Sequence, residues 1–199
     1  FKIAKEFGLK VVYASSSSVY GDPKKIPIQE NSDRKPINPY GNTKLEDEIL
    51  AERYSKEGVS IAGLRYFNVY GKGQTGSYAG VITKFINRIR EKKPPLIFGD
   101  GTQVRDFIFV EDVVQANIAA MQSSVKNGFF NVGTGIVTSI EGLAHLLIEH
   151  SGLKLEPEYE HPLEGDVRIS QADTTLTEKM LNWRYKTELK EGLQKFFPL

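Results

Sequence analysis

Two compact apolar runs in the first 67 residues flank one long segment of mixed polar and apolar residues. LKVVYASS (9–16) and VSIAGLRYF (59–67) are short apolar runs of the kind that form buried strands. PYGNTKLEDEILAERYSKEG (39–58) lies between them and has the length of a helix. Pro39 suits the first helical position and Asn38 the cap before it. This strand–helix–strand order predicts a parallel sheet with crossover helices, and therefore an α/β fold.

The rest of the chain continues with helices and short strands. T-S-I-E at 138–141 predicts a capping box that opens a helix running towards His150. The strand-like EYEHP (158–162) follows Pro157, and Trp183 is expected to be buried in the core. The remaining predicted helices are GVITKFINRIREKK (80–93), EDVVQANIAAMQ (111–122), TTLTEKMLNW (174–183) and TELKEGLQKFF (187–197).

Composition removes several classes of function. The chain has 199 residues, of which 40% are hydrophobic, enough for a real core, and its net charge of +1 gives no electrostatic reason to expect a nucleic-acid partner. With no cysteine there are no disulfides, catalytic thiolates or zinc–thiolate sites. No apolar run approaches the roughly 20 residues that span a membrane. We expect a cytoplasmic protein without membrane contact and, because the histidines lack ligand spacing, without a metal site.

Ser16, Tyr40 and Lys44 form the first candidate for chemistry. A spacing of four residues places Tyr40 and Lys44 on one face of the predicted helix, within mutual reach. A free tyrosine has a pKa of about 10, and a nearby ammonium group favours its phenolate form. With a serine hydroxyl, such a pair can deprotonate an alcohol while hydride leaves its carbon. The alternative is a chance Y-x-x-x-K on a solvated helix and a serine-rich loop.

Arg105 is the second candidate. It follows a glycine-rich turn in LIFGDGTQVRDFIFVEDV (96–113), and the planar guanidinium group suits a diphosphate because it makes two parallel hydrogen bonds. An ion pair of Arg105 with Asp106 or Asp112 is the plain alternative. In a functional reading, Asp106 orients Arg105.

Four motifs occur in one order along the chain: SSSSVYGD, PYGNTKLEDE, LRYFNVYG and GDGTQVRDFIFVEDV. This series resembles the extended short-chain dehydrogenase/reductases, and among them the UDP-glucose 4-epimerase-like enzymes of the NAD-dependent epimerase/dehydratase family. The resemblance covers essentially all 199 residues. It implies NAD as cofactor, a UDP-sugar as substrate, and a homodimer in which the helix after Pro39 pairs through Leu45, Ile49 and Leu50.

The resemblance also implies a fold and its domains. The fold class is α/β, with the C-terminal part of a Rossmann-type parallel sheet and a smaller α/β substrate-binding domain. Residues 1–70 would form the partial dinucleotide-binding domain and residues 71–199 mainly the nucleotide-sugar domain, with segments near 107–135 returning to the Rossmann part. The glycine-rich turn that cradles the dinucleotide phosphates is not found. We therefore expect the C-terminal two-thirds of an enzyme, which on its own binds NAD poorly.

Roles follow residue by residue from the same resemblance. Tyr40 takes the proton of the sugar hydroxyl, Ser16 helps to shuttle it, and Lys44 holds the nicotinamide ribose. Near the cofactor we expect Ser15, Tyr40, Lys44 and Tyr66. Near the nucleotide sugar we expect Ser16, Asn68, Phe98 for the uracil ring, Arg105 for the diphosphate, and Ser170 beside the C2 substituent.

Two departures and three alternatives remain. Leu163 stands where the family usually has a second diphosphate arginine, and Arg168 is a possible replacement. Dehydratases carry an Asp–Glu pair before V-Y-G and decarboxylases usually a glutamate at the second position, where this chain has Ser17 and Ser18. The leading interpretation is a UDP-glucose/UDP-galactose 4-epimerase that also accepts UDP-N-acetylglucosamine, because Ser170 is small. The alternatives are a UDP-uronate 4-epimerase, another dehydratase or decarboxylase of the family, and a non-catalytic fragment or binding module.

Overall fold

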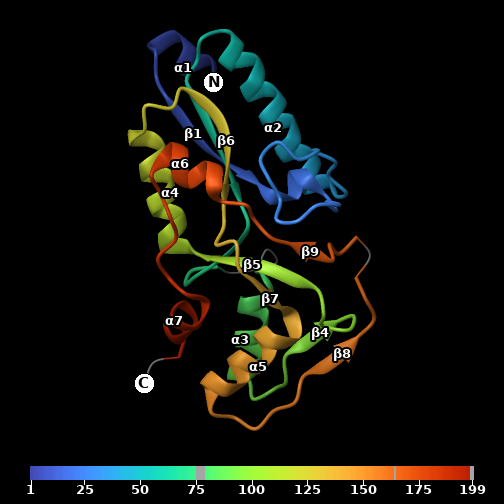
Figure 1. The fold of residues 1–199 in the computed structure, drawn as a ribbon. Coiled ribbons are helices and arrows are strands. Elements are labelled where there is room, and N and C mark those ends of the chain that lie inside the picture. Colours follow the sequence, from blue (N-terminus) through green and yellow to red (C-terminus); the bar gives the residue numbers. More distant parts are fainter. Residues whose placement is uncertain (75–78, 164, 198–199) are drawn as a thin grey trace.

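The computed structural model describes residues 1–74, 79–163 and 165–197. Its upper part is a parallel sheet in the order β1-β2-β6, in which Val11 pairs with Ile61 and Ile61 with Asn127 (Figure 1). The strands are β1 (Val11–Ser16), β2 (Ile61–Tyr66) and β6 (Asn127–Val132). Crossover helix α2 (Pro39–Lys56) connects β1 to β2. The predicted strand–helix–strand unit and the α/β fold class are confirmed.

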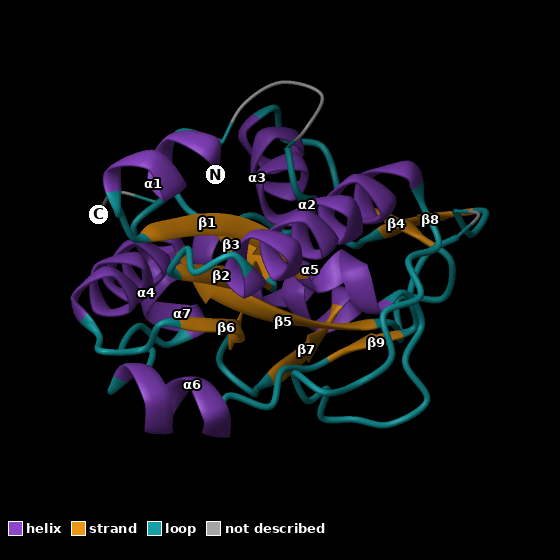
Figure 2. Ribbon diagram, turned by 90° about the horizontal axis from the view of Figure 1, so that it is seen from above, coloured by secondary structure: helices purple, strands orange, loops and turns teal. Residues whose placement is uncertain are grey.

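Helices cover both faces of this sheet. Successive residues of a strand point to opposite faces, so neighbouring residues pack against different helices. Ile61 packs with Ala4 and Ala51 of α1 (Lys2–Phe7) and α2, whereas its neighbour Ala62 packs with Ala116 and Leu181 of α4 (Val110–Gln122) and α6 (Thr175–Leu181). Figure 2 shows α2 and α4 on opposite sides of these strands. The sheet is thus buried on both sides.

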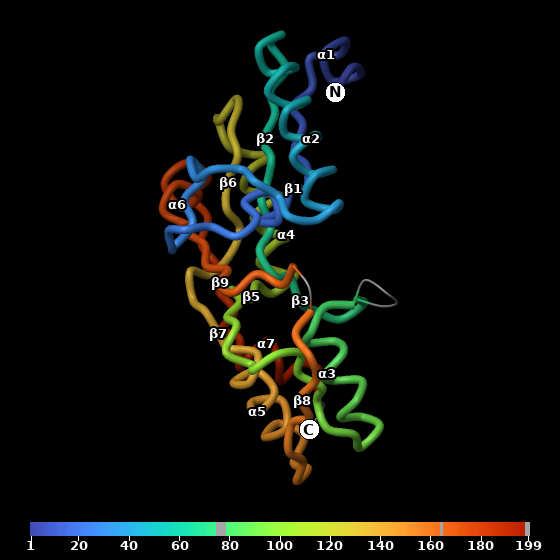
Figure 3. Tube along the Cα trace, turned by 90° about the vertical axis from the view of Figure 1, so that its right-hand side faces the viewer, coloured from blue at the N-terminus to red at the C-terminus, as the bar shows by residue number. Residues whose placement is uncertain are grey.

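A second lobe lies below this sheet in Figure 1 and is built around β5 (Val104–Phe109). β5 leads directly into α4 of the first lobe. β5 pairs in parallel with β3 (Asn68–Tyr70) and β9 (Ile169–Ser170) and antiparallel with β7 (Val137–Ser139). A separate two-stranded sheet joins β4 (Leu96–Phe98) and β8 (Glu158–Glu160). The helices of this lobe are α3 (Val81–Arg90), α5 (Ile140–Ser151) and α7 (Leu189–Gln194). The Cα trace in Figure 3 follows β5, β7 and β9 between the two lobes.

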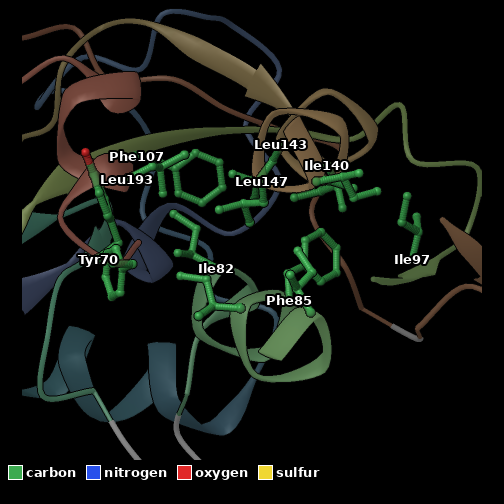
Figure 4. Packing of buried hydrophobic residues seen from close by; sticks show 14 of the residues in the cluster. Tyr70, Ile82, Phe85, Ile97, Phe107, Ile140, Leu143, Leu147 and Leu193 are labelled. Carbon is green, nitrogen blue, oxygen red and sulfur yellow. The ribbon is translucent and has the colours of Figure 1, made fainter. Parts of the chain in front are cut away.

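The core of the second lobe lies between α3, α5 and the β5 sheet. Ile82 and Phe85 of α3 face Leu143 and Leu147 of α5, and Phe107 of β5 completes the contact (Figure 4). Burying each of these large apolar side chains contributes about 1.5–3 kcal/mol. The apolar face of the helix predicted at 80–93 is therefore part of the core, and so is Trp183 in the other lobe, as expected from the sequence.

The helix ends agree with the sequence in one case and differ in another. Asn38 caps α2, its Oδ1 accepting a hydrogen bond from the Gly41 amide at 2.7 Å. The capping box at 138–141 is wrong in its details. Ser139 caps α5 instead of Thr138, and Glu141 accepts a hydrogen bond from the Tyr159 hydroxyl at 2.8 Å. Thr138 remains in β7, so the strand runs one residue further than the motif predicts.

Candidate active site

A cavity of about 310 Å³ opens where β1 and β2 end, at the start of α2. Ligands of open α/β sheets bind at this carboxyl edge, and the volume is at the lower end of the range for small-molecule sites. The sequence-predicted residues that line it are Ser15, Ser16, Tyr40, Lys44, Tyr66 and Asn68. The fold thus brings together all of the predicted cofactor and proton-transfer residues, from segments more than 50 positions apart.

Tyr40 and Lys44 lie in the first two turns of α2. The Lys44 Nζ is 6.0 Å from the centre of the Tyr40 ring. It donates hydrogen bonds to the Ala14 carbonyl at 3.1 Å and to the Asp47 carboxylate at 3.3 Å. Tyr40 is 55% exposed. Lys44 is therefore fastened to the end of β1, while the Tyr40 phenol stays accessible to a ligand in the cavity.

Ser16 ends β1 and caps the short 3₁₀ turn η1 (Ser17–Tyr20). Its Oγ accepts a hydrogen bond from the Ser18 amide at 3.1 Å and donates to the Ser18 Oγ at 3.1 Å. The capping bond fixes the direction of the Ser16 side chain. Ser18 itself lines a neighbouring hollow, so the two hydroxyls connect the cavity with that hollow.

Ser15 and Tyr66 line the cavity, but their hydroxyls are engaged elsewhere. The Ser15 Oγ donates to the Glu48 carboxylate at 2.6 Å. The Tyr66 hydroxyl donates to Asn117 Oδ1 at 2.9 Å, and burial raises the pKa of Tyr66. Cofactor contact by Ser15 and Tyr66 stays a prediction. Because both hydroxyl protons are already donated, such a contact would be made by the backbone of Ser15 and the ring of Tyr66.

The neighbouring hollow measures about 170 Å³ and shares Asn68 with the cavity. Arg105 and Ser170 line it together, because β5 and β9 pair with these two residues in register. The Arg105 guanidinium donates to the Asp166 carboxylate and to the Val104 carbonyl. Arg105 thus places a guanidinium group, paired with Asp166 of the same hollow, beside the candidate proton-transfer groups.

Asp106 does not orient Arg105, contrary to the sequence-based expectation. Its buried carboxylate accepts hydrogen bonds from the Thr134 amide and hydroxyl and from the amides of Gly135 and Ala172, at 2.7–3.1 Å. Because adjacent strand residues point to opposite faces, Asp106 faces inward and Arg105 faces the hollow. The partner of Arg105 is Asp166, and not Asp106 or Asp112.

Two further residues lie apart from the cavity and the hollow. Phe98 contributes its carbonyl to a hydrogen bond from Gln103 Nε2 at 2.8 Å and lines neither space. Arg168 pairs with Asp100 at 3.3 Å in an exposed contact and also lines neither. Leu163 is exposed. The uracil role of Phe98 stays a prediction. Arg168 pairs with Asp100 and does not reach the hollow, so it does not replace the diphosphate arginine that is missing at Leu163.

A larger hollow, about 1050 Å³, opens within the loop that connects η1 to α2. Tyr20 and residues of that one loop line it, and none of the predicted site residues takes part. We place the candidate site in the smaller cavity because hydroxyl, phenol and ammonium groups converge there. Within residues 1–74, 79–163 and 165–197, no group of three or more acidic or histidine side chains could hold a metal ion. Nor does any helix in those ranges have the length and apolar character to cross a bilayer.

Sequence reasoning missed a buried charge cluster directly beneath the cavity. Glu48 of α2 and Arg65 of β2 are both buried, and the Arg65 Nη2 lies 2.7 Å from the Glu48 Oε2. The signal was present in the sequence: an arginine within the apolar strand LRYF, and a glutamate one turn beyond Lys44. Arginine inside a buried strand requires a partner, because an unpaired buried charge costs several kcal/mol.

The parallel sheet β1-β2-β6, with the Tyr40–Lys44 helix at its carboxyl edge, is an α/β fold of the Rossmann type. The family model described as "NAD dependent epimerase/dehydratase family" matches residues 1–133. The chain belongs to this family.

Individual relatives are similar over nearly the whole chain. A putative UDP-glucose 4-epimerase of Methanocaldococcus jannaschii is 40% identical over 189 residues, which cover 94% of this chain and 61% of the relative. A UDP-glucuronate 4-epimerase of Thermodesulfobacterium geofontis is 34% identical over 98% of this chain and 60% of the relative. The chain therefore spans about 60% of the length of these curated relatives.

Solved structures show the same architecture. The UDP-glucose 4-epimerase of Thermotoga maritima with UDP-glucose superposes with a TM-score of 0.93 at 38% identity, covering 98% of this chain and 66% of that one. The UDP-glucuronic acid 4-epimerase of Bacillus cereus, in complex with UDP-glucuronic acid and NAD, gives a TM-score of 0.90 at 31% identity, covering 97% and 62%.

Proposed function

We propose that this chain carries the proton-transfer groups and the sugar-nucleotide lobe of an NAD-dependent nucleotide-sugar 4-epimerase. One observation carries the proposal. The cavity that gathers Ser16, Tyr40 and Lys44 adjoins the hollow of Arg105 and Ser170, and Asn68 lines both. A sugar in the cavity with its diphosphate near Arg105 would therefore span two sites that the fold already connects.

The residues fit the cofactor that the family description implies. The cavity lies at the carboxyl edge of the sheet, and Lys44 offers an ammonium donor of the kind that holds a ribose. Its volume suits one end of a dinucleotide and not the whole molecule. When bound, NAD supplies the hydride acceptor and donor for transient oxidation at C4 of the sugar.

The chain's own residues handle the proton. Tyr40, exposed at the cavity, takes the proton of the C4 hydroxyl as that carbon is oxidised, and returns it when the carbon is reduced on its opposite face. Lys44, held by the Ala14 carbonyl, places an ammonium group near the Tyr40 ring and stabilises the negative charge that a phenolate would carry. With substrate bound, the Ser16 hydroxyl would turn its one proton from the Ser18 Oγ to the same substrate oxygen.

The substrate proposal is UDP-glucose and UDP-galactose, with UDP-N-acetylglucosamine also accepted. Ser170 lines the hollow and not the cavity; it supports the broader range because C2 is next to the carbon that carries the diphosphate, so a C2 acetamido group would lie toward the hollow, where a small side chain leaves room. A UDP-uronate 4-epimerase is the second candidate, favoured by relatives named as UDP-glucuronate 4-epimerases at 34% and 31% identity. A UDP-N-acetyl-alpha-D-glucosaminuronate decarboxylase of Bacillus cytotoxicus is also 33% identical. Ser17 and Ser18 provide no carboxylate at the positions that elimination or decarboxylation would use.

A homodimer through α2 belongs to the same proposal. Ile49 and Leu50 are 54% and 43% exposed, and Ile3 and Phe7 of the neighbouring α1 are exposed too. Leu45, by contrast, packs against the buried cluster of Val19, Tyr20 and Ile28 inside the subunit. We therefore assign the dimer contact to Ile49 and Leu50 and not to Leu45.

The experiment that tests the function uses the complete protein that contains this chain. Purified protein is assayed for C4 epimerisation with UDP-glucose, UDP-N-acetylglucosamine and UDP-glucuronic acid in parallel. Turnover of at least one of them, lost in Tyr40→Phe, supports the proposal. Binding of UDP-sugars without any turnover would favour the remaining alternative, a binding module.

A further inference from the structure

The Glu48 carboxylate joins three elements beneath the cavity. It accepts hydrogen bonds from the Ser15 hydroxyl of β1 at 2.6 Å and from Arg65 of β2 at 2.8 and 2.7 Å. A fourth, from Arg34, measures 3.1 Å. Glu48 itself is on α2 and is fully buried. One side chain therefore ties the helix that carries Tyr40 to the ends of both strands.

Arg65 is held as firmly as its partner. Its Nη1 donates to the Tyr20 hydroxyl at 2.8 Å and to the Glu30 carbonyl at 2.9 Å. Its guanidinium carbon lies 4.9 Å from the ring centres of both Tyr20 and Phe129. Burial opposes the charge of Glu48, but the hydrogen bonds and positive charge of Arg65 outweigh it, so the pKa of Glu48 is lowered and the carboxylate stays ionised.

The spacing along α2 links this cluster to the candidate proton-transfer groups. Tyr40, Lys44 and Glu48 follow one another at intervals of four residues and form one stripe of the helix. Lys44 binds the Ala14 carbonyl and Glu48 the Ser15 hydroxyl, so two consecutive residues of β1 are fastened to that stripe. Ser16 is the next residue, and the bond at Ser15 sets where it stands relative to Tyr40.

We propose that Glu48, held in place by Arg65, is a positioning residue that aligns Ser16 with Tyr40 for proton transfer. The inference rests on the proposed function. Glu48 does not line the cavity and acts only through Ser15 and the helix. A misplacement of the reacting groups by about 1 Å can cost about 10²-fold in rate. The hydrogen bonds of Glu48 to Ser15 and Arg65 therefore control turnover and leave substrate affinity nearly unchanged.

Glu48→Gln in the complete protein is the main test, and Glu52→Gln is its matched control. Glu52 lies one turn further along α2, is partly exposed, and pairs with Arg34 at 2.8 Å. Glu48→Gln should lower kcat by about 10²-fold and change KM by less than about threefold. Binding of UDP, measured by calorimetry, should change little, because Arg105 and Ser170, which line the neighbouring hollow, belong to β5 and β9 and not to the elements that Glu48 joins. Glu52→Gln should leave all three quantities at wild-type values.

Ser15→Ala keeps the inference testable if Glu48→Gln does not fold. This variant preserves the Glu48–Arg65 ion pair and removes only the bond to β1, so kcat should fall by about tenfold with KM retained. A folded Glu48→Gln or Ser15→Ala protein with kcat within about twofold of wild type would overturn the inference. So would a loss of UDP binding in proportion to the loss of kcat.

A different measurement separates this inference from the function on which it rests. If the wild type turns over no nucleotide sugar, the proposed function fails, and amide hydrogen exchange decides the role of Glu48. Glu48→Gln or Ser15→Ala should then speed exchange in residues 15–18 and in the first turn of α2, relative to Glu52→Gln. Unchanged exchange in both segments would refute the positioning role.

Discussion

Substitution of Asp106 tests how the two lobes are held together beside the site. Its buried carboxylate receives four hydrogen bonds: two from Thr134 and one each from the amides of Gly135 and Ala172. These donors belong to the segments that follow β6 and β9. One side chain of β5 therefore holds together three parts of the chain that are distant in sequence.

The structure predicts a graded effect for Asn and Ala. An Asn side chain at 106 is best oriented with its NH₂ group toward Thr134 and its oxygen toward the backbone amides of Gly135 and Ala172. The Thr134 hydroxyl can then turn to accept a hydrogen bond from the NH₂ group, but the backbone amide of Thr134 loses its acceptor. One unsatisfied buried donor costs about 1–3 kcal/mol. Burial raises the pKa of Asp106, so the neutral Asn recovers some of that cost and the net loss should be about 1–2 kcal/mol. Ala leaves three amides unpaired and should cost about 3 kcal/mol or more.

Urea unfolding of wild type, Asp106→Asn and Asp106→Ala measures these free energies of unfolding. Asp33→Asn is the control, because Asp33 is exposed and pairs only with Lys35 on the surface, so its unfolding midpoint should stay at the wild-type value. An Ala variant as stable as the Asn variant, or an Asn variant equal to wild type, would show that the four hydrogen bonds do not carry the stability assigned to them.

Four further outcomes are expected. Tyr40→Phe should lower turnover in the complete protein by about 10²-fold or more while UDP-sugar binding changes little; retained turnover would reject Tyr40 as the proton acceptor. Ser170→Tyr should abolish activity on UDP-N-acetylglucosamine and spare UDP-glucose, whereas equal loss of both would remove Ser170 from the sugar pocket. Ile49→Glu with Leu50→Glu should convert a dimer to a monomer in sedimentation velocity; an unchanged sedimentation coefficient would place the contact elsewhere. The Glu48 carboxylate, whose folded pKa is lowered from 4.5, stabilises the fold above pH 4.5 and loses that contribution as the pH falls through the folded value, so acid unfolding of wild type should include a component that Glu48→Gln lacks.

Local patterns along the chain were sufficient to predict β1, α2 and β2. The apolar runs at β1 and β2 and the Asn38–Pro39 start of α2 depend on neighbouring residues, so the sequence expresses them directly. The error at α5 has a local cause as well. Thr138 and Ser139 are both good caps, and the choice depends on how far β7 pairs with β5, which is a contact between distant segments.

The candidate site was predictable where its residues are set by a motif. Ser16, Tyr40 and Lys44 meet at one cavity because a strand end and a helix start converge there in any β-α-β unit of this kind. The partners of the charged groups were not predictable. Arg105 had Asp106 next to it in sequence, but strand alternation separates the two, and Asp166 reaches Arg105 from a different segment.

The buried cluster of Glu48 and Arg65 shows why such partners escape a reading of the sequence. Each residue looks ordinary in its own element: Glu48 belongs to a run of charged helix residues, and Arg65 to a strand that ends in polar groups. Their burial follows from the packing of α2 on β2 and from the stacking of Arg65 between Tyr20 and Phe129. A hydrophobic pair of similar size would often be as stable as a buried ion pair. Stability alone therefore does not account for the charges, whereas a carboxylate at position 48 accepts hydrogen bonds from the Ser15 hydroxyl and from two nitrogens of Arg65 at once.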